Sequence, residues 1–392
     1  MSGMNLYDAS EQWAKRPADQ RFGSLEEMRT VCRGYANSAR QAVVPMDAIV
    51  INSPDDHELC VVGPSGVPAK LTHWSFGQLC NRANAPAGYL RSLPAPLAAN
   101  CLTNGLTANR EEGAKANVLF HQNGSLICRS FTSDDYARIW NADLVERLQA
   151  AQECGWRVPP ARPAFEGQPG SRPATEDDVL QHRTTGGGLS INVGDMIAPA
   201  GLYASDHDMF AFMMNENFRI EDGSDGGLSR GFFVQNSEVG ASALKLTRFL
   251  LRHCCGNHIC WDVKDVKETR IIHRGHNDRR YARELRSSLW SYANESCVAD
   301  QQRVTSAKAC ILGHTKDDVI DRLFVAKILP RKTLEAAYDH AVQEADLRST
   351  GTSPRSAWGM CQGVTALSQK ELHADSRAEM DRAGGKILSI AF

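Results

Sequence analysis

The chain has 392 residues, of which 42% are hydrophobic and 23% charged, and its formal net charge is -2. This length allows two or three domains, or one large core with additions. The near-neutral charge excludes a wholly basic nucleic-acid coat protein, so any site for a polyanion must be local. No run of about 18 apolar residues occurs, and residues 1–16 lack the apolar core of a signal peptide. We therefore expect a cytoplasmic protein that does not contact a membrane, with buried thiols rather than disulfides.

The N-terminal region, residues 1–156, carries signals for both helices and strands. Ser24 and Glu27 form a capping box, which predicts a helix over residues 25–38. Asn123-Gly124 predicts a hairpin between strands 115–122 and 125–131, because both central residues of a type I′ turn need positive φ. A second hairpin is predicted for residues 47–52 and 58–62. Further helices are predicted from His73, over 86–93 and 96–106, and from an N-cap at Asn141 to Gly155.

Three further regions follow the N-terminal one. Residues 157–185 are rich in proline and glycine, which indicates a linker or surface loop. We expect a β-rich core over residues 186–313, including strands within 189–203, and a helical region over 314–392 with helices from Thr315, from Thr333 and over 357–368. The glycines 186–188 lack the lysine of a phosphate loop and indicate a hinge. The predicted fold class is α+β, with a mixed or antiparallel sheet core and flanking helices.

Two groups of residues contain the donor atoms that metal ions prefer. The first is Asp206-His207-Asp208, with Asp195, Glu216 and Glu221 nearby in sequence, because carboxylates and an imidazole can hold a divalent cation. The second comprises His253, Cys254, Cys255, His258 and Cys260, with His273 and His276 downstream. Neither spacing is a recognised metal motif. A solvated acidic loop and small buried thiols beside Gly256-Asn257 are the alternatives, so we assign no metal ligand, no catalytic residue and no cofactor from sequence.

A basic segment over about residues 245–286 gives the clearest indication of function in the sequence. Arginine and lysine side chains attract phosphates, and arginine also stacks on bases. The residues that we expect to bind nucleic acid are Lys245, Arg248, Arg252, Lys264, Lys267, Arg270, Arg274, Arg279, Arg280 and Arg283. The alternative is a solvated amphipathic helix over residues 278–290, whose charges face water.

Several short segments resemble the phage/plasmid-like proteins of the domain-of-unknown-function 932 family. These are 75–79, 89–94, 136–140, 236–240 (NSEVG), 252–257, His273-Arg274 and 356–369 (SAWGMCQGVTALSQ). The resemblance spans about residues 70 to 380. It implies a protein of a mobile genetic element that acts in the cytoplasm of a bacterial host, and it favours strands over 231–261, where periodicity leaves Leu244–Leu251 undecided between strand and helix.

Three functions remain open from the sequence. The leading hypothesis is a non-enzymatic nucleic-acid-binding protein that handles single-stranded DNA in replication or recombination; a homo-oligomer is a possible form, and the sequence leaves the oligomeric state open. The second is an anti-defence protein that binds a host protein. The third is a metal-dependent hydrolase that uses Asp206, His207 and Asp208, with His273 and His276 as further candidates.

Overall fold

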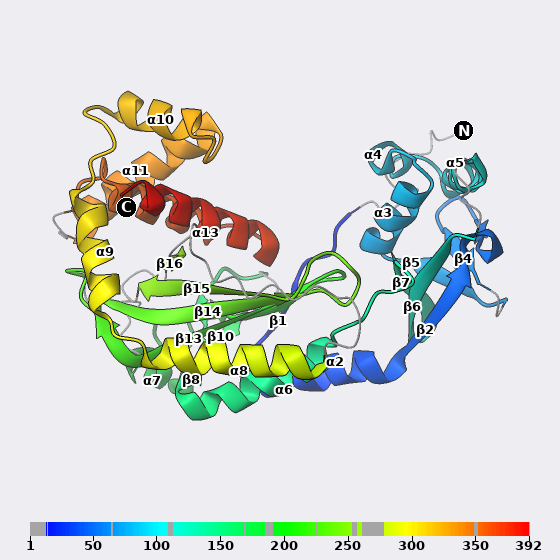
Figure 1. Cartoon of the computed structure of the whole chain (residues 1–392), viewed down its shortest axis with the longest axis horizontal. Coiled ribbons are helices and arrows are strands. Elements are labelled where there is room, and N and C mark those ends of the chain that lie inside the picture. Colours follow the sequence, from blue (N-terminus) through cyan, green and yellow to red (C-terminus); the bar gives the residue numbers. More distant parts are fainter. Residues whose placement is uncertain are drawn as a thin grey trace.

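The computed structural model describes residues 13, 15–63, 66–108, 113–167, 170–184, 191–224, 226–252, 257–260, 278–348 and 352–391. An N-terminal lobe and a C-terminal helical lobe lie at opposite ends of a central sheet and rise on the same side, so the chain has the outline of a U (Figure 1). The fold is α+β, with antiparallel and mixed sheets and a helical C-terminal region, as the sequence predicts.

The central sheet is antiparallel and has the order β1-β12-β13-β14-β15-β16, with β8 also paired to β13. Its strands are β1 (Gln20–Phe22), β8 (Trp156–Arg157), β12 (Leu202–Ala204), β13 (Met209–Ile220), β14 (Leu228–Asn236), β15 (Lys245–Arg252) and β16 (Asn257–Cys260). The segment that periodicity leaves undecided is a strand, because β15 pairs with β14 along its whole length.

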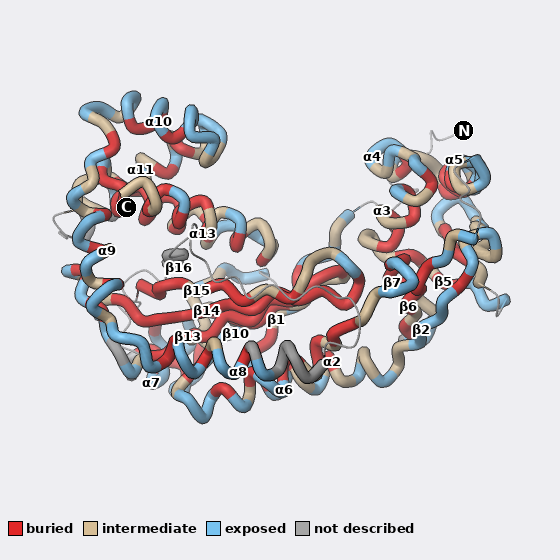
Figure 2. Tube along the Cα trace, in the orientation of Figure 1, coloured by how far each residue is buried: buried red, intermediate tan, exposed pale blue. Residues whose placement is uncertain are grey.

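Helices cover both faces of this sheet, and the alternation of side chains along β13 explains why. Met209, Ala211 and Met213 pack on one face against helices α2 (Leu25–Ser38), α6 (Asn141–Ala151) and α8 (Asp278–Asn294). Phe210 and Phe212 point to the other face, which α13 (Ala374–Leu388) covers. The strands between these layers are buried, as Figure 2 shows.

The N-terminal lobe is a six-stranded sheet with three helices. Its strands, in spatial order, are β2 (Ala39–Pro45), β6 (Lys115–Asn123), β7 (Ser125–Thr132), β5 (Pro68–Leu71), β4 (Cys60–Val62) and β3 (Val50–Asn52). Its helices are α3 (His73–Arg82), α4 (Ala87–Leu90) and α5 (Ala95–Ala108). Both predicted hairpins are confirmed, and Gly124 has the positive φ (72°) that the β6–β7 turn needs. Residues 46–48 form a 3-10 turn, η2, instead of the start of a strand.

The proline-rich segment is more ordered than a linker. It contains β9 (Arg162–Pro163), β10 (Arg172–Pro173) and helix α7 (Glu176–Thr184), and β9 and β10 pair with β11 (Met196–Ala198). A small core stabilises this unit, made by Ala174, Val179, Ile191 and Ile197. The predicted strands within 189–203 are β11 and β12, which belong to different sheets. Glycines 186–188 lie outside the described residues.

The C-terminal region is helical. It comprises α9 (Val298–Ala309), α10 (Lys316–Val325), α11 (Arg331–Arg348), α12 (Ala357–Ser368) and α13. Thr315 caps α10 as predicted, whereas α11 begins at Arg331, before Thr333. In the part of the chain that the structure describes, no helix has both the length and the hydrophobicity to cross a membrane.

Candidate metal centre

The turn between β12 and β13 brings an imidazole and carboxylates together. Ser205 stabilises this turn, because its Oγ donates to Asp208 Oδ1 (2.7 Å) and accepts from the Asp208 N–H (3.0 Å). His207, in the middle of the turn, lies beside Asp375 in the first turn of α13. His207, Asp208 and Asp375 each offer one ligand atom, and these three atoms lie within 4.8 Å of one another.

Both ring nitrogens of His207 face carboxylates. Nδ1 lies 2.7 Å from Asp206 Oδ1. Nε2 lies 3.7 Å from Asp208 Oδ2 and 3.8 Å from Asp375 Oδ2. The imidazole stacks on the Trp74 ring with a centroid separation of 4.8 Å. The backbone N–H of Trp74 donates to Asp206 Oδ2 (2.9 Å). Metal-binding histidines are commonly held in this way, with one nitrogen oriented by a carboxylate and the other directed at the ion.

An N-terminal segment holds the start of α13 in position. Arg16 Nη1 lies 2.7 Å from Asp375 Oδ2, and its Nη2 lies 3.3 Å from Asp19 Oδ1. Asp19 Oδ2 also accepts from the Ala374 N–H (2.7 Å), which satisfies a free donor at the helix start. Since Arg16 shares Asp375 Oδ2, a metal ion bound by this oxygen would displace the guanidinium from it.

The carboxylates determine the charge of His207. Burial lowers the pKa of His207, but the hydrogen bond to Asp206 and the nearby Asp375 and Asp208 outweigh burial and raise this pKa to about 9. Burial also raises the pKa of Asp208. Burial opposes ionisation of Asp375 as well, but His207 and Arg16 hold its pKa below the ordinary value. A cation is therefore favoured between these carboxylates, and it is either the protonated imidazole or a metal ion bound to the neutral ring.

The distances suit a small divalent ion. Zinc lies about 2.0–2.2 Å from imidazole nitrogen and carboxylate oxygen, so two ligands of one tetrahedral ion are about 3.4 Å apart. The separations of 3.7 and 3.8 Å from Nε2 are slightly longer than this. The side chains of His207 and Asp208 are 9% and 4% exposed, whereas that of Asp375 is 29% exposed. If a metal ion binds here, three protein ligands and an exposed side leave one position open for a further ligand, as catalytic zinc sites do.

The segment Asn236–Gly240, which carries part of the family resemblance, supports this centre. Ser237 Oγ donates to the His207 carbonyl (2.5 Å). The Val239 carbonyl accepts from Trp74 Nε1 (3.2 Å). The segment thus holds both the turn that carries the imidazole and the ring on which it stacks.

The same segment joins the central sheet to the N-terminal lobe. Glu238 is 3% exposed, accepts from the Asn141 N–H (2.8 Å) at the start of α6, and pairs with Arg129 (3.0 Å) in β7. Asn236 Nδ2 donates to Asn141 Oδ1 (2.8 Å). The structural purpose of this motif is therefore to fix the lobe, α6 and the His207 turn relative to one another.

The three predicted nucleic-acid-binding residues in β15 do not form one surface. Arg252 requires a correction, because it is buried, with 2% exposure, and pairs with Asp222. Arg248 lies over the ring of Tyr292, on the face of the sheet that α8 covers, and pairs with Glu295. Lys245 is an odd number of residues from both arginines, so its side chain points to the opposite face of the strand.

The other predicted basic residues are described only in part. Arg283 is exposed on α8. Arg279 and Arg280 belong to α8, but their side chains are not described. Lys264, Lys267, Arg270 and Arg274 lie outside the described residues.

The other predicted metal ligands do not join the centre. Asp195 accepts from the Asn192 N–H in an exposed turn, and Glu216 pairs with Arg219. Glu221 is exposed, and its backbone N–H donates to a side chain of α9.

Most of the second predicted cluster is not described. His253, Cys254, Cys255, His273 and His276 lie outside the described residues. His258 and Cys260 belong to β16, but their side chains are not described.

Asp375 is the residue of the candidate cluster that sequence reasoning missed. It lies far from His207 in sequence, within the last long helix, and no motif links the two. The only local signal is an acidic residue in the first turn of a helix, which usually serves the helix dipole.

Comparison of the chain with models of protein families, with curated proteins and with solved structures finds no match. The resemblance to the domain-of-unknown-function 932 family therefore gains no support and stays a sequence-based hypothesis.

Proposed function

We propose that this protein is a metal-dependent hydrolase whose ion is bound by His207 Nε2, Asp208 and Asp375. The proposal rests on the surroundings of the two ring nitrogens of His207. Carboxylate oxygens of Asp208 and Asp375 lie 3.7 and 3.8 Å from Nε2, and Asp206 fixes the other nitrogen, Nδ1, at 2.7 Å. A bound divalent ion supplies a water of lowered pKa, which is a hydroxide nucleophile near neutral pH.

The surrounding residues support a hydrolytic role. Asp206 orients the imidazole, and Ser205 holds Asp208 through a hydrogen bond of 2.7 Å, so two of the ligands are positioned before an ion binds. Asp375 is the most exposed of the three ligands, so substrate approaches from its side. Arg16, once it leaves Asp375 Oδ2, is placed to bind an oxygen of an anionic substrate. A phosphate ester is the substrate class that suits this arrangement.

Metal analysis tests the proposal directly. The purified protein is stripped with a chelator and then titrated with zinc, manganese and magnesium, and bound metal is measured by mass spectrometry. Hydrolysis of bis(p-nitrophenyl) phosphate and of p-nitrophenyl acetate is followed with each ion. We expect one ion per chain and activity that His207→Ala and Asp375→Asn abolish. Failure of every ion to bind removes the proposal, and binding without hydrolysis of any ester reduces the site to a structural one.

Nucleic-acid binding is the second candidate; it rests on the basic sequence of residues 245–286, of which Arg248 and Arg252 are engaged within the fold. Among the described residues of that segment, the exposed side chain of Arg283 is available for a phosphate. The test is an electrophoretic shift assay with single- and double-stranded DNA at increasing salt, because phosphate contacts weaken steeply as salt is added. No shift at low salt excludes this function, and a nuclease-insensitive host protein recovered by pull-down would favour the anti-defence alternative.

A further inference from the structure

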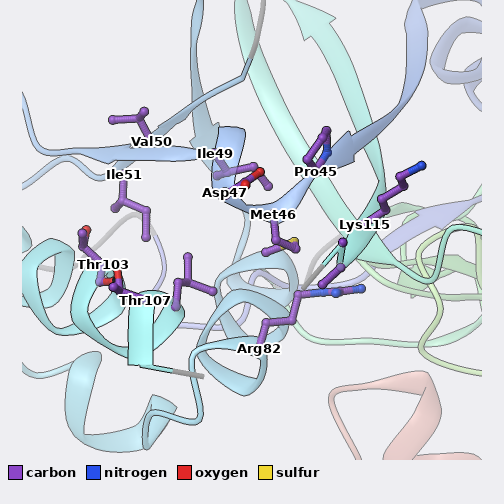
Figure 3. A pocket seen from close by; sticks show the side chains of 13 residues that line it. Pro45, Met46, Asp47, Ile49, Val50, Ile51, Arg82, Thr103, Thr107 and Lys115 are labelled. Carbon is purple, nitrogen blue, oxygen red and sulfur yellow. Dashed lines mark hydrogen bonds between the residues drawn. The ribbon is translucent and has the colours of Figure 1, made fainter. Parts of the chain in front are cut away.

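A cavity of about 640 Å³ lies in the N-terminal lobe, between η2–β3 and helix α5 (Figure 3). None of its lining residues belongs to the His207 centre. Its walls are formed by Pro45, Met46, Asp47, Ile49, Val50, Ile51, Arg82, Thr103, Leu106, Thr107, Gly113, Ala114 and Lys115. This volume is typical of sites for small organic ligands, which measure about 300–1,000 Å³.

Arg82 is the cation best placed to bind a ligand in this cavity. It ends α3, and its Nη2 donates to the carbonyls of Phe131 (3.2 Å) and Thr132 (2.9 Å) in β7. These bonds fix the guanidinium in one position. Within the described part of the chain, Nη1 makes no hydrogen bond, so one donor edge of an anchored guanidinium is left for a ligand.

Among the described residues, no carboxylate forms an ion pair with Arg82. Burial lowers the pKa of Arg82, and no carboxylate of the described residues raises it again. Lys115 adds a second cation at the exposed rim, and Figure 3 shows its ammonium end directed away from the Arg82 guanidinium. Asp47 is the acidic residue of the lining. An anion beside Arg82 Nη1 would gain a charged partner that is half-buried and pre-positioned, with Lys115 as a second cation at the rim.

Part of the cavity wall is apolar. Met46, Ile49, Ile51 and Leu106 line it and pack against the core of the lobe. On the α5 side, Thr103 and Thr107 are one helical turn apart (Figure 3). Because Thr107 Oγ1 donates to the Thr103 carbonyl (2.9 Å), its lone pairs accept from a ligand. One end of the cavity thus suits an anionic group, and the remainder suits an apolar or aromatic body with a hydrogen-bond donor.

We infer that this cavity binds a small organic anion, with its phosphate or carboxylate on Arg82 Nη1 and Lys115 and its apolar body against Ile49, Ile51 and Leu106. This site is separate from the metal centre and does not depend on the proposed hydrolysis. Its ligand is a substrate fragment or an effector of the N-terminal lobe.

Calorimetric titration of the full chain with matched probes tests the inference. Adenosine monophosphate and benzoate represent the phosphate and carboxylate classes, adenosine and benzamide are their neutral counterparts, and inorganic phosphate tests the anion alone. We expect at least one organic anion to bind about tenfold or more tightly than its neutral counterpart, since a hydrogen bond to a charged group contributes about 1.5–3 kcal/mol. Inorganic phosphate is expected to bind more weakly than the favoured organic anion.

Variants identify the cavity as the site. Arg82→Gln is expected to lower the affinity about tenfold or more. Because this change also removes hydrogen bonds to β7, Lys115→Gln is tested beside it and is expected to weaken binding several-fold without loss of structure. Arg40→Gln, on the exposed part of β2, is the matched control and is expected to leave binding unchanged. The inference is overturned if no organic anion binds, if the neutral counterparts bind equally well, or if Lys115→Gln and Arg82→Gln both bind like the wild type.

Discussion

Arg252 and Asp222 form an ion pair in the protein interior, with Arg252 Nε 2.9 Å from Asp222 Oδ2 and side-chain exposures of 3% and 0%. Arg252 Nη1 also donates to Gln362 Oε1 (3.3 Å) in α12. The pair therefore joins the end of β15 to the loop after β13 and to the C-terminal lobe. A buried charge that loses its partner costs far more than the pair itself contributes, so this arginine acts on stability rather than on a ligand.

Arg252→Gln is expected to destabilise the fold by about 3–5 kcal/mol, because it leaves Asp222 charged and buried. Urea unfolding measures the free energy. Arg283→Gln is the matched control: its exposed side chain predicts a change of about 0.5 kcal/mol or less. If Arg252→Gln unfolds like the wild type and instead loses DNA binding, the arginine has a surface role that this geometry excludes.

Substitutions at the metal centre should separate ligands from the residue that orients them. Asp375→Asn and His207→Ala remove a ligand and are expected to abolish stoichiometric binding of metal. Asp206→Asn removes no ligand but alters the carboxylate that holds Nδ1 and accepts the Trp74 backbone N–H, and it is expected to lower the affinity about 10- to 100-fold. Asp339→Asn, an exposed acid that pairs with Lys316, is the control and should bind metal normally. Equal affinity in all four variants would locate the ion elsewhere.

Metal affinity should rise with pH between about 6 and 8. The pKa of His207 without metal is about 9, because Asp206 and the neighbouring carboxylates outweigh its burial. An ion must therefore displace a proton from Nε2 throughout this range, and the apparent affinity increases about tenfold per pH unit. Titrations at pH 6, 7 and 8 measure the slope. A flat profile would mean that the imidazole is not a ligand.

The buried carboxyl group of Asp381 should make the free energy of unfolding depend on pH. It lies fully buried in α13, where Ser368 Oγ donates to its Oδ1 (2.5 Å). Burial raises its pKa from 3.8 to about 6, since the nearby Arg377 and the hydrogen bond from Ser368 only partly offset it. The folded state therefore holds this proton more tightly than the unfolded state. The associated stability is fully present below about pH 4 and is lost as the pH rises through about 6.

Asp381→Asn removes this ionisation. A shift of two pKa units corresponds to about 3 kcal/mol. Between about pH 4 and 7, the free energy of unfolding of the wild type is therefore expected to fall by up to about that much relative to the variant. Urea unfolding of both proteins across this range gives the difference. Parallel profiles would contradict the assigned shift.

The sequence by itself determined the local elements. Ser24 accepts from the Glu27 N–H and Glu27 from the Gly23 N–H, so helix α2 begins where its capping box predicts. The β6–β7 turn likewise follows from Asn123-Gly124, because its positive φ is a local requirement. Such signals involve residues a few positions apart, and burial of the amphipathic faces then gives the α+β class.

Tertiary structure decided where the charged residues lie. The predicted N-cap Asn141 is inside α6, because Glu238, in the turn after β14, accepts its N–H and replaces a local cap. From the sequence, Arg252 is expected to be a surface cation. In the structure, the C-terminal lobe packs over β15 and Asp222 pairs with this arginine. The candidate metal centre depends on the same step. Asp208 and His207 are adjacent in sequence, but Asp375, the third residue of the cluster, reaches them only when α13 packs on the sheet, and no local pattern encodes that contact.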